Sequence, residues 1–269
     1  MNTLQVIILS IIQGITEFLP VSSSGHLSLL PKLFGWNQQP TSFDIVLHAG
    51  TLLAIIFFFR LKLQKNLKGI LNKDKKSIAL TKKIIIGVVP ALVIGFILAL
   101  SNEYTDDKID SILKGEYLTI FLLIFIGIIF LYSKNIFKGK TVQIEELPTR
   151  NVLNIGFGQI LAFMRGTSRS GITILFGLAN GLKIKDAAEF SFLMGIPLIA
   201  FSFFYQLGVF ILEGESGVSL FHYALGFIVS FVSGYLAISL MLKYLENHGL
   251  AIFGFYRIIL GIIALIILL

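Results

Sequence analysis

A run of hydroxyl-bearing and charged residues near the N-terminus could bind and cleave a phosphate compound. Gln13 and Glu17 are four residues apart, so they share one face of a helix. Pro20 ends that helix, and Ser22–His26 then places three serines, a glycine and a histidine in a tight turn. Serine-rich turns are usually helix caps. Beside His26, however, these hydroxyls and the unpaired backbone N–H groups favour binding of an anion.

A second run, Arg165–Thr173, repeats several of these ingredients. Arg169 stands between two serines and close to a glycine at an expected helix break, where a guanidinium can hold two phosphate oxygens at once. The alternative is an arginine that reaches out to the lipid headgroups, which suits Arg165 and Arg257 better. An ionised carboxylate such as Glu17 costs at least ~2.5 kcal/mol in a bilayer, so it should face a partner, an ion or water rather than serve only as a structural hydrogen bond. The two runs together indicate phosphate chemistry.

The other histidines and buried acids have weaker signals. Asp44 and His48 form a further pair four residues apart. A shift of 145 residues, part of the internal repeat described below, places Asp44 on Glu189. For these residues we favour hydrogen bonds that orient helices near the membrane interface. His222 and His248 lie at loop edges and receive no role.

The composition places all these residues in a membrane protein. Of 269 residues, 55% are hydrophobic and 14% are charged, whereas a soluble domain carries about 25% charged residues. The mean hydropathy is +0.87. There is no cysteine, which excludes disulfides, thiolate metal sites and a cysteine nucleophile. The net charge of +7 does not indicate nucleic acid, because the lysines lie in loops between apolar runs.

We therefore expect an all-α polytopic membrane protein with a single membrane domain over residues 1–269. The basic connection Arg60–Lys83 is expected in the cytoplasm, and the acidic connection Glu103–Glu116 on the opposite side. Six apolar runs are close to the ~20 residues that a spanning helix needs. These expected spans are Phe43–Phe59, Ile84–Leu100, Tyr117–Tyr132, Ala187–Leu212, Leu220–Leu242 and Leu250–Leu269.

The segments that carry the two chemical runs do not fit this pattern as spans. Val152–Leu182 is largely apolar, yet it lies between two basic connections that are both expected in the cytoplasm. We therefore expect a re-entrant helical hairpin there, broken at Arg165–Gly171. The N-terminal region up to about Leu33 is either one span or a second re-entrant hairpin, broken at Pro20–Gly25.

An internal repeat favours the second hairpin. A shift of 146 residues aligns Gln13–Gly25 with Gln159–Gly171 at a glutamine, two serines and a glycine. Each half, about residues 1–133 and 150–269, would then hold one hairpin and three spans. Since three crossings is an odd number, the two repeats must have inverted topology. Sites in such proteins lie where broken helices meet.

At these two runs the sequence resembles the undecaprenyl-diphosphate phosphatase family, the bacitracin-resistance enzymes of bacterial envelopes. The family's Gln/Glu-x3-Glu motif stands here as Gln13 and Glu17, and it leads directly into Phe-Leu-Pro-Val-Ser-Ser-Ser-Gly-His. The family's Pro-Gly-x-Ser-Arg-Ser-Gly motif stands here as Arg165–Gly171, with Arg165 in place of the usual proline. Length and spacing agree over essentially the whole chain. Further matching stretches are Phe43–His48, Ala187–Phe192 and Tyr256-Arg257.

The resemblance implies an activity and a setting. It implies hydrolysis of undecaprenyl diphosphate to undecaprenyl phosphate and inorganic phosphate with a divalent cation, which recycles the lipid carrier for cell-wall synthesis and confers bacitracin resistance. It also implies a site at the outer face of the bacterial cytoplasmic membrane. The expected partners are the prenyl diphosphate substrate and membrane lipids, with no nucleic acid, and a homodimer is one option for assembly.

The residues can be assigned roles in that reaction. We assign Glu17, with Gln13 near it, to hold a Mg²⁺ or Ca²⁺ ion, since these ions prefer oxygen ligands, and Arg169 to bind phosphate. The attacking group could be Ser23 with His26 as its base, His26 itself, or metal-bound water; we favour Ser23 with His26. The expected substrate-binding residues are Gln13, Ser22, Ser24, Gly25, Gly166, Thr167, Ser168, Ser170, Gly171 and Thr173.

The main alternative is a transporter or flippase for a lipid phosphate or another anion. Paired hairpins in inverted repeats are transporter architecture. The cluster of hydroxyl, histidine and carboxylate groups favours an enzyme, because binding alone would not require it. The phenylalanine-rich stretches Ile55–Phe59 and Phe201–Tyr205 could line a groove for the prenyl chain, although we expect them to face lipid or neighbouring helices.

Overall fold

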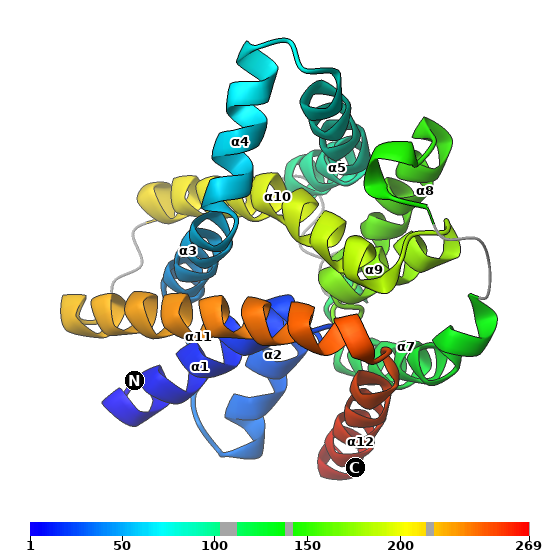
Figure 1. Cartoon of the computed structure of the whole chain (residues 1–269). Coiled ribbons are helices and arrows are strands. Elements are labelled where there is room, and N and C mark those ends of the chain that lie inside the picture. The colour runs from blue at the N-terminus through cyan, green and yellow to red at the C-terminus, as the bar shows by residue number, and fades with distance from the viewer. Residues whose placement is uncertain (103–111, 138–141, 214–217, 269) are drawn as a thin grey trace.

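The computed structural model is an assembly of α-helices (Figure 1). It describes residues 1–102, 112–137, 142–213 and 218–268. Within these ranges there is no β-strand, and a single isolated bridge joins Val142 to Leu182. The helices are α1 (Thr3–Phe18), α2 (Ser23–Leu33), α3 (Thr41–Phe58), α4 (Arg60–Leu71), α5 (Lys75–Asn102), α7 (Glu116–Ile136), η1 (Ile144–Glu146), α8 (Thr149–Ile160), η2 (Leu161–Phe163), α9 (Arg169–Ala179), α10 (Ile184–Glu213), α11 (Leu220–Asn247) and α12 (Ala251–Leu268).

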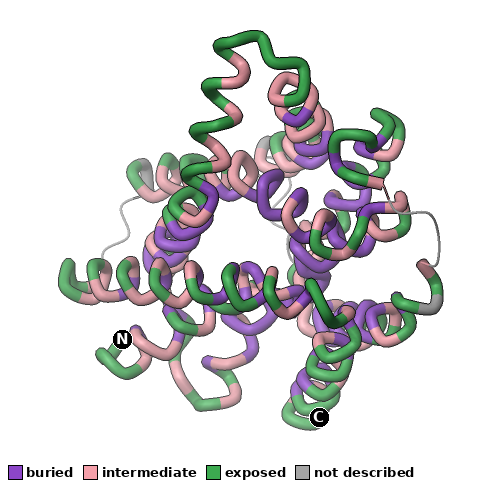
Figure 2. Tube along the Cα trace, in the orientation of Figure 1, coloured by how far each residue is buried: buried purple, intermediate pink, exposed green. Residues whose placement is uncertain are grey.

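Six of these helices, α3, α5, α7, α10, α11 and α12, are long and apolar enough to cross a membrane. They correspond in order to the six expected spans, which confirms a multi-pass α-helical membrane protein. Large apolar side chains on these helices, such as Phe204 and Ile266, are each 67% exposed, as expected where lipid would cover them. Figure 2 shows exposed residues recurring along these helices. The acidic connection falls largely on residues 103–111, outside the described ranges.

The basic connection between the first two spans is mostly helical. It consists of α4 and the beginning of α5, which starts at Lys75 rather than at Ile84. A short turn separates the two helices. The carboxylate of Asp74 accepts hydrogen bonds from the backbone N–H and the hydroxyl of Ser77, and these bonds lower the pKa of Asp74. The turn is therefore a capped helix start rather than an irregular loop.

Both chemical runs lie in helix–break–helix hairpins. The first consists of α1 and α2, and the second of α8, η2 and α9. The breaks are shorter than the sequence predicts, because α2 already begins at Ser23 and α9 already begins at Arg169. Each serine–glycine stretch is thus the first turn of a helix, and its backbone N–H groups point toward the break.

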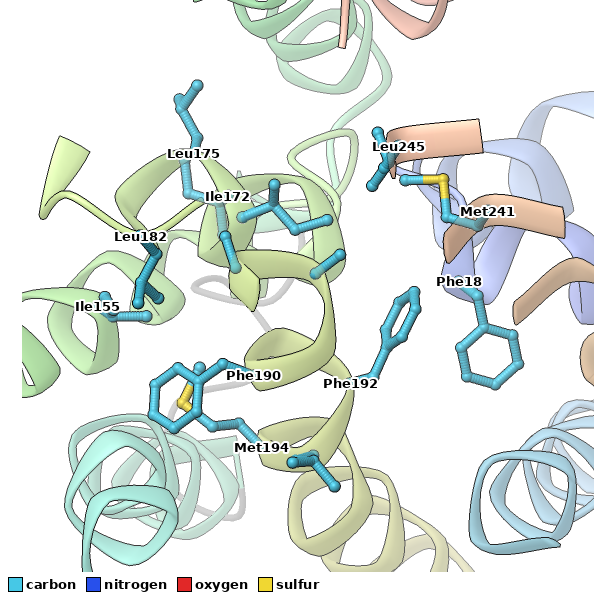
Figure 3. Packing of buried hydrophobic residues seen from close by; sticks show 14 of the residues in the cluster. Phe18, Ile155, Ile172, Leu175, Leu182, Phe190, Phe192, Met194, Met241 and Leu245 are labelled. Atoms are coloured by element: carbon cyan, nitrogen blue, oxygen red, sulfur yellow. The ribbon is translucent and has the colours of Figure 1, made fainter. Parts of the chain in front are cut away.

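The two halves of the chain interlock around the largest of the three hydrophobic clusters that the described residues form. Helix α1 packs against α11, and α8 packs against α5, so each hairpin is held by a span from the other half. Phe18 at the end of α1 meets Phe192 of α10 edge-to-face, with the ring centroids 5.7 Å apart. Met241 of α11 and Ile172 of α9 belong to the same cluster (Figure 3). This core fixes the positions of both breaks relative to each other.

Candidate active site

The two breaks have nearly identical geometry, 146 residues apart. Ser22 precedes α2 with φ 73°, and Ser168 precedes α9 with the same φ. Each serine hydroxyl caps the helix that follows: Ser22 Oγ accepts from the N–H of Gly25 at 3.3 Å, and Ser168 Oγ accepts from the N–H of Gly171 at 3.2 Å. Left-handed backbone at a residue other than glycine costs on the order of 1–3 kcal/mol. The surrounding structure holds this strain at both breaks, which marks them as functional candidates.

Glu17 lies where the two breaks meet. Its Oε2 accepts hydrogen bonds from Ser23 Oγ at 2.9 Å and from Gln13 Nε2 at 3.2 Å. Its Oε1 lies 3.1 Å from Nη2 of Arg169, which comes from the other half of the chain. The carboxylate from one hairpin and the guanidinium from the other therefore share one site, as the sequence requires. They line a cavity of about 240 Å³.

Helix α10 positions the guanidinium of Arg169. The Nη1 atom donates to the carbonyl oxygen of Ser191 at 3.2 Å. Gly195, one turn further along α10, leaves room for the guanidinium, since a Cβ atom there would lie 2.3 Å from Nη1. Thr173, one turn into α9, donates to the carbonyl oxygen of Arg169 at 2.8 Å and lies 2.6 Å from the hydroxyl of Ser191. Neither Ser191 nor Gly195 was predicted from the sequence to belong to the site.

The other expected substrate-binding residues divide into two groups. Ser22, Ser24 and Ser168 line the cavity together with Ser23 and Arg169. The second group shapes the breaks from behind, outside the cavity lining: Gly25, Gly166, Thr167, Ser170, Gly171 and Thr173.

Gly166 and Ser170 show how this second group acts. Gly166 has φ 92°, and a Cβ atom there would lie 2.4 Å from the carbonyl oxygen of Thr119, so only glycine fits. Ser170 Oγ donates to the carbonyl oxygen of Leu19 at 3.3 Å, which joins the second break to the first. These residues fix the shape of the site without facing its interior.

His26 does not reach Ser23. Its Nδ1 lies 2.7 Å from the carbonyl oxygen of Ser22, so Nδ1 carries a proton, and its Nε2 lies 2.6 Å from the hydroxyl of Tyr256. The side chain is 3% exposed and does not line the cavity. Both ring nitrogens are engaged within the protein, and the hydroxyl of Ser23 donates to Glu17 instead. The hydrogen bond expected between Ser23 and His26 is not formed.

Arg257 does not reach the lipid headgroups, contrary to the sequence interpretation. Its side chain is fully buried, and its guanidinium donates to five backbone carbonyl oxygens. The acceptors lie in the first break, in the second break and in the middle of α7, so Arg257 joins these three regions. The acceptors are Pro20, Gly166, Thr167, Leu122 and Leu123, at 2.6–3.4 Å. The planar guanidinium carries five N–H donors, which suits this set of acceptors. A lysine has only three donors and could not replace Arg257 here.

A larger cavity of about 590 Å³ adjoins the first, and the two share the lining residues Ala91, Phe163, Leu198 and Ser202. Asp44 and Arg165 lie in its wall. Asp44 Oδ1 accepts a hydrogen bond from Gln39 at 3.1 Å, and Arg165 Nη1 donates to the carbonyl oxygen of Lys114 at 3.3 Å. The stretch Phe201–Tyr205 was expected to face lipid or other helices, yet Phe201 and Tyr205 also line this cavity.

Gln13 and Glu17 suit a hard divalent cation only together with ligands from a bound molecule. The Oε1 atom of Gln13 is buried and accepts no hydrogen bond within the described part of the chain. Among the described residues there is no cluster of three or more histidine, cysteine, aspartate or glutamate side chains that could hold a metal. Mg²⁺ sites commonly use one or two carboxylates and complete the shell with phosphate oxygens and water. Glu17 lines the cavity, whereas Gln13 is fully buried directly behind it. With ligands from a bound phosphate, Glu17 from the wall and Gln13 from behind it would complete such a site.

The fold and the cavity define a class of protein: a polytopic α-helical membrane protein in which two broken hairpins bring a carboxylate, a hydroxyl and a guanidinium together. The family model described as bacitracin resistance protein BacA matches residues 6–263, and the chain belongs to this family.

Three similar relatives agree with this assignment over their full lengths. The undecaprenyl-diphosphatase of Sulfurihydrogenibium sp. is 37% identical over 98% of both chains. Undecaprenyl-diphosphatase 1 of Pseudoalteromonas translucida is 36% identical over 97% of both chains. The undecaprenyl-diphosphatase of Rubrobacter xylanophilus is 34% identical over 100% of this chain and 99% of the relative.

Proposed function

We propose that this protein hydrolyses undecaprenyl diphosphate to undecaprenyl phosphate and inorganic phosphate, and so recycles the lipid carrier for cell-wall synthesis and confers bacitracin resistance. The observation that carries the proposal is the convergence of Ser23, Glu17 and Arg169 in one cavity, with Glu17 contacting both of the others. Family membership and the names of the relatives point the same way.

The hydrogen bond from Ser23 to Glu17 supports Ser23 as the nucleophile and Glu17 as its base. In this mechanism Ser23 Oγ attacks the terminal phosphorus while its proton passes to Glu17. The bond from that phosphorus to the bridging oxygen breaks, and the prenyl monophosphate leaves. Water then cleaves the phosphoserine. Of the three routes left open by the sequence, this one keeps Ser23 as the attacking group and replaces His26 with Glu17 as the base.

Charge neutralisation supplies most of the expected catalysis, because phosphoryl transfer demands little covalent chemistry from the protein. Arg169 binds oxygens of the transferred phosphoryl group, and the backbone N–H groups at the starts of α2 and α9 add positive potential. Gln13 and Glu17 would hold the divalent cation, which when bound neutralises phosphate charge. The ion pair with Arg169 keeps the Glu17 carboxylate oriented toward Ser23.

The site requires a particular topology in the membrane. We place the α1–α2 and α8–α9 hairpins as re-entrant elements of two inverted repeats, since the breaks have the same φ and the same caps. In this arrangement the cavity opens to the outer face of the bacterial cytoplasmic membrane, where the spent lipid is released. The exchange of packing partners between the halves, α1 on α11 and α8 on α5, supports this placement.

Phosphate release from undecaprenyl diphosphate by the purified protein in detergent tests the proposal. A transporter or flippase has no activity in detergent, so release of phosphate distinguishes the two functions. A phosphoserine trapped on Ser23 by rapid acid quench, and absent from Ser23→Ala, would support the covalent route. An intact protein that releases no phosphate with Mg²⁺ or Ca²⁺ present would refute the enzymatic function.

A further inference from the structure

His48 lies in the wall of the catalytic cavity, although its sequence context suggested only a helix-orienting role. Its Nδ1 lies 2.8 Å from the carbonyl oxygen of Asp44, one turn earlier on α3. Because a carbonyl oxygen can only accept, Nδ1 carries a proton and the ring is held in one orientation. The other nitrogen, Nε2, makes no hydrogen bond to any described residue. It is therefore available to a molecule bound in the cavity.

The contrast with His26 shows that this availability is specific. His26 is buried outside the cavity with both nitrogens engaged. His48 is half-buried, with one nitrogen fixed by its own helix and the other free to exchange a proton. Imidazole is the side chain best suited to proton exchange near neutral pH. Of the two histidines near the breaks, only His48 is placed to act on a substrate.

The proposed reaction leaves two proton transfers unassigned. Glu17 takes the proton of Ser23, and Arg169 stays protonated throughout. The bridging oxygen gains negative charge when the prenyl monophosphate leaves, and a proton donor there would assist its departure; the attacking water must lose a proton. Among the described residues that line the cavity, the acidic or basic side chains are those of Glu17, Arg169 and His48. His48 is the remaining candidate for both transfers.

We infer that His48 is a catalytic residue that protonates the leaving phosphate and then deprotonates water, an inference that rests on the proposed function. This role requires His48 to begin as the imidazolium, with a proton on each ring nitrogen. In the first step the Oγ–P bond forms, the P–O bond to the bridging oxygen breaks, and that oxygen takes the Nε2 proton, which leaves His48 neutral. In the second step the oxygen of water bonds to phosphorus and its proton returns to Nε2. The P–Oγ bond breaks, and Ser23 recovers its proton from Glu17. One water is consumed, and every residue regains its starting state.

Replacing His48 with glutamine tests this role, because glutamine keeps a polar group in the wall and cannot relay a proton. We expect kcat of His48→Gln to fall about 10²-fold or more, the usual size of a lost general acid or base. KM should change little, because binding in the ground state depends on Arg169 and the helix starts. The matched control is His222→Gln, at a half-buried histidine far from the cavity lining whose Nε2 lies 3.2 Å from the hydroxyl of Thr3.

Chemical rescue separates proton transfer from a structural role. In His48→Ala, imidazole added to the buffer should restore at least tenfold of the lost kcat, since small acids and bases can replace a missing one. The same imidazole should not help Ser23→Ala. A His48→Gln protein with near wild-type kcat would overturn the inference, as would a His48→Ala protein that folds but does not respond to imidazole. If the wild type itself releases no phosphate, the proposed function fails instead.

Discussion

The first and second breaks have the same backbone conformation and differ in the side chain that follows the cap. Residues 22–25 read Ser-Ser-Ser-Gly and residues 168–171 read Ser-Arg-Ser-Gly. Both caps have φ 73°, and both first helical residues, Ser23 and Arg169, hydrogen-bond to Glu17. One scaffold thus presents a neutral hydroxyl from one side and a fixed positive charge from the other.

The two copies of the repeated motif therefore share one feature and differ in another. The shared parts, a strained serine cap and a helix start, create potential for binding an anion at both breaks. In the proposed mechanism, the divergent position assigns attack to Ser23 at the first break and charge neutralisation to Arg169 at the second. Only the first half supplies the acid, because the position equivalent to Glu17 in the second half is Phe163.

The largest effect is expected when the second break is given the sequence of the first. Arg169→Ser gives the second break the Ser-Ser-Ser-Gly sequence of the first. We expect kcat/KM to fall by about 10²–10³-fold, the size of one lost electrostatic donor in a transition state. The cap by Ser168 remains, but the largely buried Glu17 loses its charged partner, so Tm in detergent should also fall, and kcat/KM is measured per folded protein. Arg150→Ser, at an exposed position near the start of α8, is the control. Near-normal turnover of Arg169→Ser would remove the guanidinium from the mechanism.

Arg257 supports both breaks at once, so its loss should affect them together. Arg257→Met leaves five backbone carbonyls without their donor, and we expect stability to fall by about 3 kcal/mol or more. Thermal unfolding in detergent measures this. Arg60→Met is the control, because Arg60 is exposed and donates to a single carbonyl, that of Phe57. An unchanged Tm in Arg257→Met would mean that the breaks hold their shape without Arg257.

Gly195→Ala should disturb only the second break. The new Cβ would lie 2.3 Å from Nη1 of Arg169 and displace its flexible end from Glu17. We expect kcat/KM to fall by about tenfold, equivalent to about 1.4 kcal/mol, with little change in Tm. Gly208→Ala on the same helix is the matched control, since nothing lies within 4 Å of its Cβ position. Equal activity of the two variants would show that the guanidinium tolerates displacement.

The smallest expected effects come from the caps. Ser22→Ala and Ser168→Ala each remove one hydroxyl that accepts from a backbone N–H, which costs about 1 kcal/mol. Equivalent breaks should lose equal stability, as read from Tm. Ser219→Ala provides the reference for an unstrained cap, because Ser219 caps α11 with φ −66°. A clear inequality between the first two variants would show that the breaks are alike in shape only.

Much of the fold could be predicted because it depends on local composition. Six apolar runs of spanning length identify the six spans, and Pro20 with the serine–glycine runs identifies both breaks. The meeting of Glu17 with Arg169 was also predictable, since a carboxylate and a guanidinium within apolar segments each need a partner. These features follow from the cost of placing polar groups in lipid.

The roles of the two histidines could not be predicted, because they depend on tertiary contacts. His26 follows Ser23 by one helical turn, and this spacing suggested a catalytic pair. The ring Nε2 is instead hydrogen-bonded to the hydroxyl of Tyr256, 230 positions away along the chain. His48 faces the cavity only because of how α3 is rotated against α1 and α10. Arg257 did give a signal, since an arginine within an apolar span is rarely at the surface by chance.

Arg257 also makes the shape of both breaks depend on α12, which follows them in the chain. Helices emerge from the ribosome in order, N-terminal segments first. Both breaks are complete in sequence long before α12 is made, yet their carbonyls find the donors of Arg257 only when α12 inserts. A chain shortened before α12 would therefore lack the donors that join the two breaks to α7.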